Sequence, residues 1–123
     1  MTSSPLPGNA AKRVLLIFAK GDRTVPNPTT AALIRSGDLA DSTTLYRADL
    51  AYAQSPSAMP KNPHNFSFCG VQTAEKPFAL AAQRQIATFL KSDGRLIVDP
   101  DGAAPIFETP FRGPLPEGLD YYP

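Results

Sequence analysis

One apolar run, residues 14–19, constrains the fold of this chain more than any other segment, because an acidic turn at residues 20–26 follows it directly. The run is continuous rather than alternating, which is typical of a parallel strand covered on both faces. We therefore expect a buried strand over residues 13–19. Asn27 and Pro28 then indicate the start of a helix, with Asn27 as its cap. Strand, turn and helix in this order predict an α/β fold.

Three further sequence patterns extend this prediction. Gly37 is expected to supply the left-handed residue that ends the first helix. Residues 43–48 carry strong β-forming side chains and predict a second strand. A longer helix is predicted from Pro77 to about Lys91, with Gly94 at its end. Helical spacing gives this helix a buried apolar face of Phe78, Ala82, Ile86, Phe89 and Leu90, and a mostly outer face of Gln83, Arg84, Gln85 and Lys91.

A long segment, residues 49–73, is predicted to be loop because prolines interrupt it repeatedly. A loop of this length in a compact domain is usually functional or disordered. It contains His64, which is the only histidine of the chain. Tyr46 and Tyr52 are expected to cover the edge of the sheet.

The C-terminal part of the sequence predicts a β-hairpin. Residues 95–98 and 105–109 read as two strands, and the Asp-Gly pair within residues 99–102 favours a tight reversal between them. A proline-rich tail along the surface is expected after the hairpin. The organisation we predict is a flexible lead, an α/β portion, and the hairpin with its tail, at residues 1–12, 13–94 and 95–123.

Composition excludes several classes of partner and cofactor. The net charge is +1 with charges scattered singly, so neither nucleic acid nor an anionic membrane is an expected partner. One cysteine and one histidine give no metal-type spacing, so we expect no metal and no cofactor. The first residues lack the pattern of a signal peptide, and no apolar run approaches the ~20 residues that span a bilayer. The expectation is therefore a soluble chain, cytoplasmic by default.

Asp22 and His64 are the candidate catalytic residues. A loop directly after a parallel strand is where ligands and catalytic groups gather, and Asp22 is placed there. His64 lies on the long loop after the next predicted strand. In a Ser-His-acid triad the acid orients the imidazole and stabilises the imidazolium that forms. Each residue also has a structural interpretation, Asp22 as a turn former and His64 as an incidental loop residue.

The residues around this pair resemble the C-terminal part of the α/β-hydrolase fold. Residues 14–26 resemble the penultimate strand and acid loop, the Asn62-Pro63-His64 tripeptide resembles the histidine loop, and residues 78–90 resemble the final helix. Asp22 before His64 is the chain order of that family. Within it, the loop at residues 60–64 and the turn at residues 99–102 are most similar to large bacterial esterase- or lipase-type members.

This resemblance implies the acid and the histidine of a carboxylic-ester hydrolase, with a small-molecule ester as substrate. The nucleophile elbow G-x-S-x-G of the family is absent, and so is its oxyanion-hole glycine motif. Ser36, Ser42 and Ser67 are not placed to substitute for the nucleophile. We therefore expect the isolated chain to be inactive, and an ester to be hydrolysed only once the missing N-terminal part is supplied.

The main alternative is a non-catalytic small α/β module, or a pseudo-hydrolase, that binds a partner. The predicted strand at residues 13–19 would have an exposed edge, which favours self-association. A thioredoxin- or flavodoxin-like domain is a weaker alternative, because Cys-x-x-Cys and a glycine-rich phosphate loop are both missing.

Overall fold

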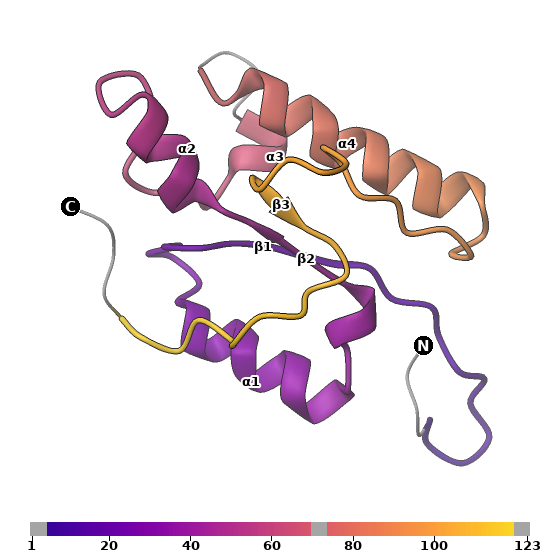
Figure 1. The fold of residues 1–123 in the computed structure, drawn as a ribbon. Helices are drawn as coiled ribbons and strands as arrows, with labels where there is room; N and C mark the ends of the chain where they lie inside the picture. The colour runs from indigo at the N-terminus through magenta and orange to yellow at the C-terminus, as the bar shows by residue number, and fades with distance from the viewer. Residues whose placement is uncertain (1–4, 70–73, 120–123) are drawn as a thin grey trace.

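The structure is a computed structural model, which describes residues 5–69 and 74–119. It contains a small three-stranded sheet with helices on both faces, so the predicted α/β class is confirmed (Figure 1). The parts of the predicted lead, loop and tail at residues 1–4, 70–73 and 120–123 lie outside the described residues. In chain order the elements are β1 (Leu16–Ala19), α1 (Asn27–Gly37), a 3₁₀ turn (Ala40–Ser42), β2 (Thr43–Tyr46), α2 (Ala48–Gln54), α3 (Phe66–Cys69), α4 (Lys76–Lys91) and β3 (Phe107–Glu108).

The sheet has the strand order β1-β2-β3. β1 and β2 are parallel, with Leu16 opposite Thr43, and β3 runs antiparallel to β2. The first predicted strand is therefore confirmed, although it is shorter than residues 13–19. β1 lies at one side of the sheet, and β2 is its only strand partner among the described residues.

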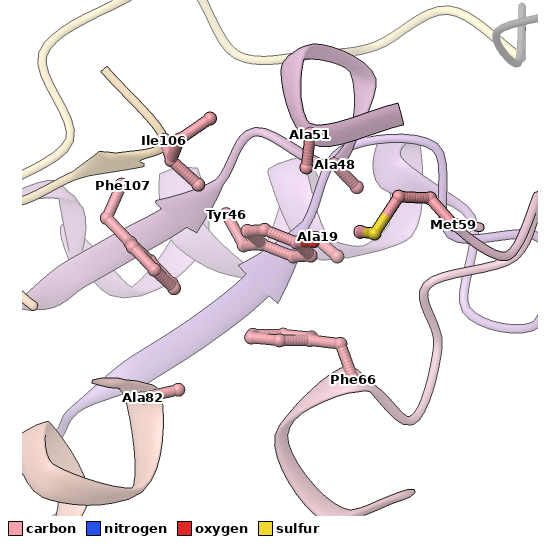
Figure 2. Close-up of a cluster of buried hydrophobic side chains, with 9 residues drawn as sticks. All are labelled: Ala19, Tyr46, Ala48, Ala51, Met59, Phe66, Ala82, Ile106 and Phe107. Carbon is pink, nitrogen blue, oxygen red and sulfur yellow. The ribbon is translucent and has the colours of Figure 1, made fainter. Parts of the chain in front are cut away.

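Alternating side chains of β1 fill two separate cores. Leu16 and Phe18 face α1, where Phe18 packs with Ile34, Leu45 and Phe111. Ile17 and Ala19 face the layer of α3 and α4 instead. The core on this second face, which we call the tyrosine cluster, consists of Ala19, Tyr46, Ala48, Ala51, Met59, Phe66, Ala82, Ile106 and Phe107 (Figure 2).

Tyr46 lies at the centre of the tyrosine cluster and is fully buried, so the expectation that it covers the sheet edge was wrong. Its ring stacks on Phe66 with centroids 4.3 Å apart and on Phe107 at 5.3 Å (Figure 2). Such aromatic pairs contribute about 0.5–1.5 kcal/mol beyond the area that they bury. β3 and the segment after His64 are thereby both held against β2.

The segment predicted as proline-interrupted loop contains two helices, so that prediction was wrong in part. α2 forms because Ala48–Gln54 combines good helix formers and has no proline. Prolines at positions 56, 60 and 63 follow it, and helix resumes only as the single turn of α3.

The long helix α4 is confirmed, with Pro77 in its first turn, but its faces differ from the prediction. Gln85 is fully buried and Leu90 is 70% exposed. Buried Gln85 is tolerated because its Nε2 donates to Thr44 Oγ1 at 2.8 Å and to the carbonyl of Val98 at 2.6 Å. Apolar spacing alone therefore misplaced the inward face by about one position.

The predicted C-terminal hairpin does not form. Residues 95–98 are not a strand, and Leu96 and Val98 are 56% and 38% exposed. Asp101 Oδ2 accepts the backbone N–H groups of Ile106 and Phe107, which orders the turn and directs β3 to the edge of β2 instead. The tail then runs along the α1 face, where Leu115 packs against the core.

The end of α1 also differs from the prediction. The left-handed residue is Asp38 (φ 50°), and Gly37 is the last residue of the helix. A Cβ added at Gly37 would lie 2.8 Å from Cγ of Leu39, so the glycine is needed for this close approach. Within residues 5–69 and 74–119, no helix has both the length and the apolar character to cross a membrane.

Candidate active site

The acid turn, residues 20–26, leaves the sheet at the end of β1. Gly21 has φ +85°, which lets the backbone reverse there without strain. The side chain of Asn27 accepts the N–H of Gly21 and donates to the carbonyl of Ala19, both at 2.8 Å. Asn27 was predicted as a helix cap; it is instead the first residue of α1, and its buried side chain fixes the exit of β1.

Asp22 is held by its own turn. Its Oδ1 accepts the backbone N–H groups of Thr24 at 2.8 Å and Val25 at 2.9 Å. Two such bonds fix the rotamer of the carboxylate. The side chain is only 13% exposed. One oxygen is thus used to fix the carboxylate, and Oδ2 is left to contact another group.

The histidine turn, residues 61–65, places His64 beside that oxygen. Pro63 is fully buried, and its carbonyl accepts the N–H of Phe66 at the start of α3. Nδ1 of His64 lies 2.9 Å from Oδ2 of Asp22. A carboxylate can only accept, so Nδ1 carries the proton and Nε2 of a neutral ring is the basic nitrogen. The structure therefore brings together the two residues predicted from the sequence.

The outer side of the His64 ring is open. The side chain is 32% exposed, and Nε2 has no hydrogen-bond partner among the described residues. Within that part of the chain, no serine or threonine side chain is hydrogen-bonded to His64 either. The arrangement holds an acid and a base in contact, with the basic nitrogen directed away from the acid.

Asn62 is a residue of the site that the sequence analysis missed. Its Oδ1 accepts the N–H of Arg23 at 3.1 Å and the N–H of His64 at 3.3 Å. Its Nδ2 donates to Oγ1 of Thr24 at 3.1 Å. A signal was present, since asparagine side chains commonly accept a backbone N–H two residues later. The contacts with the acid turn, 38 and 39 residues away, left no local pattern.

An ion-pair network lies at the same end of the sheet. Lys20 follows β1, Arg47 follows β2, and both donate to Asp49, at 2.8 and 2.9 Å. Arg47 also donates to Glu108 of β3 at 2.9 Å. Burial alone would raise the pKa of Asp49, but the hydrogen bonds from Arg47 and Lys20 outweigh it and lower that pKa to about 2. The network joins the ends of all three strands.

No group of three or more metal-ligating side chains occurs in the portion of the chain that the structure describes. A comparison with protein-family models, with curated proteins and with solved structures finds no match to this chain.

Proposed function

We propose that Asp22 and His64 are the acid and the base of a serine-type ester hydrolase whose nucleophile is carried by another segment. The observation that supports this most is the 2.9 Å contact between Nδ1 of His64 and Oδ2 of Asp22, made while Nε2 has no hydrogen-bond partner among the described residues. Here one nitrogen is fixed by a carboxylate, and the other is available to a substrate-side group.

The placement of the pair supports the same assignment. The acid follows one parallel strand directly, and the histidine follows the next strand after an intervening helix, α2. The long helix α4 then returns across the sheet (Figure 1). This order resembles the last part of an α/β-hydrolase fold, with β3 as an added antiparallel strand.

In the proposed reaction, Nε2 of His64 removes the proton of a serine hydroxyl as its oxygen attacks the ester carbonyl. The tetrahedral intermediate collapses when the same proton passes from the imidazolium to the leaving alcohol. A water molecule then attacks the acyl-enzyme while Nε2 of His64 takes its proton. The same proton returns to the serine oxygen as the carboxylic acid product leaves. Throughout, Asp22 remains ionised, orients the ring and stabilises the imidazolium.

Fluorophosphonate labelling tests this proposal. We expect the 123-residue chain alone to remain unlabelled. A longer protein that adds the upstream in-frame sequence, with a G-x-S-x-G segment in it, should be labelled, and His64→Ala should reduce the labelling rate by at least about a thousandfold. Labelling of the short chain, or labelling of the long protein that does not depend on His64, would contradict the proposal.

A second candidate function, an interaction module, is favoured by the side of β1 that has no strand partner among the described residues. An apolar groove lies there, and Phe68 and Leu90 on its wall are 72% and 70% exposed. The groove is lined by Leu15, Ile17, Ser67, Phe68, Ile86, Phe89 and Leu90. Unpaired strand edges beside apolar side chains favour association with another chain.

Sedimentation velocity distinguishes this second candidate. If the groove joins copies of the chain, the wild type should dimerise with rising concentration and Phe68→Glu should be monomeric. Leu33→Glu is the matched control, because Leu33 is 51% exposed on α1, away from the groove. A wild type that remains monomeric at all concentrations would exclude self-association through this edge.

A further inference from the structure

Asn62 connects the acid turn to the histidine turn through both ends of its amide. Its Oδ1 accepts N–H groups from Arg23 and from His64, and its Nδ2 donates to Thr24. Both backbone groups are donors, so only the carbonyl end of the amide can face them. The orientation of the Asn62 side chain is therefore fixed by the hydrogen bonds themselves.

These contacts lie on either side of the Asp22–His64 bond. Arg23 is the residue directly after Asp22, and His64 is separated from Asn62 only by Pro63. Pro63 has a fixed φ and is fully buried, so it is a rigid link between the anchored amide and the Cα of His64. A shift at Asn62 would consequently move the imidazole relative to the carboxylate.

We propose that Asn62 is a positioning residue that keeps Nδ1 of His64 within hydrogen-bonding distance of Oδ2 of Asp22. Its importance to the reaction rests on the proposed function, but the geometric role does not. Asn62 is itself exposed, so its hydrogen bonds contribute little to global stability. Their effect is local, because they tie the backbone that carries the acid to the backbone that carries the base.

The exchange rate of the Nδ1 proton with water measures this role directly. His64 is the only histidine, so the NMR spectrum of ring-labelled protein contains one imidazole. Asp22→Asn is the reference for a broken pair. We expect Asn62→Ala to accelerate exchange about tenfold, the effect of weakening one hydrogen bond. Asn62→Asp should retain most of the protection, because it still accepts both backbone N–H groups.

Asn65→Ala is the matched control, since Asn65 is an exposed asparagine of the same turn. It should leave the exchange rate at the wild-type value. Fast exchange in Asn62→Ala with a native backbone spectrum supports the positioning role. Wild-type exchange in Asn62→Ala, combined with fast exchange in Asp22→Asn, overturns that role alone. An Nδ1 proton unaffected even by Asp22→Asn overturns it together with the proposed function.

Discussion

At the scale of single residues, asparagine and glutamine side chains determine much of this structure. Asn27 fixes the end of β1, and Asn62 joins the acid turn to the histidine turn. Gln85 crosses the core to reach β2 and the segment before β3. Asn27 and Asn62 each donate and accept through one planar amide, which suits contacts between elements that do not pair by backbone hydrogen bonds. Gln85 only donates, and its buried Oε1 has no hydrogen-bond partner among the described residues.

Truncation of Gln85 should be costly. Gln85→Ala removes hydrogen bonds to Thr44 and Val98 and leaves a cavity in a fully buried position. We expect a loss of about 2–4 kcal/mol in the free energy of unfolding, measured by urea denaturation. Arg84→Ala, at the exposed neighbouring position, should change it by less than about 0.5 kcal/mol. Equal effects of the two substitutions would mean that the buried amide is not structural.

The sequence identified Asp22 and His64 because both signals are local. An aspartate after a buried strand and a single histidine in a loop can each be recognised from the sequence without knowledge of which residues they contact. The contacts of Asn62 with Arg23 and Thr24, and of Gln85 with Thr44, span 38 to 41 residues. Hydrogen bonds at that separation leave no periodic pattern, so they could not be predicted.

At the scale of elements, β1, β2 and α4 were predictable because each has a pattern of its own. α2 was missed because the prolines after it dominated the prediction for the whole segment. The hairpin was predicted wrongly for a different reason. Residues 95–98 have strand-like composition, but tertiary packing decided the outcome: β3 pairs with β2, and Val98 contacts Gln85 instead of a strand.

The end of α1 gives a prediction at this scale. Alanine is favoured over glycine inside a helix by about 1 kcal/mol, yet Gly37→Ala should destabilise the protein by about 1 kcal/mol. The added Cβ would lie 2.8 Å from Cγ of Leu39 and displace that buried side chain. Thermal denaturation measures the effect, with Ser36→Ala as the control because Ser36 is an exposed position of the same helix. A stabilising Gly37→Ala would show that Leu39 relaxes without cost.

At the scale of the whole molecule, ion pairs between side chains join the strands at one end of the sheet. On its other side, β1 has no strand partner among the described residues. Lys20, Arg47, Asp49 and Glu108 connect the ends of the three strands close to the acid turn. The open side is β1, where the strand that leads to Asp22 has no further partner among the described residues. A segment that carried the nucleophile would have backbone groups and an apolar groove to bind there.

The ion-pair network predicts how stability depends on pH. The pKa of Asp49 is lowered in the fold from 3.8 to about 2, so its contribution is present above pH 3.8. It is lost as the pH falls through that interval. Asp49→Asn should lower the free energy of unfolding by roughly 1 kcal/mol near neutral pH, since the ion pairs of Asp49 are partly exposed. Below about pH 2 it should not change that free energy.

Acid denaturation followed by circular dichroism measures this difference. Asp41→Asn is the control, because the Asp41 carboxylate is 78% exposed and pairs with Arg112, which is itself exposed. The stability of the Asp41→Asn variant should equal that of the wild type at every pH. A gap between wild type and Asp49→Asn that stayed constant down to the lowest pH would contradict the assigned network.

The tautomer of His64 is the most direct test of the central claim, that Asp22 holds this ring as a base. Because the chain has one histidine, the nitrogen-15 chemical shifts of the neutral imidazole ring report its tautomer without assignment work. We expect the proton on Nδ1 and a free Nε2 in the wild type. In Asp22→Asn we expect the other tautomer or an average of the two. A wild-type ring protonated on Nε2 would contradict it.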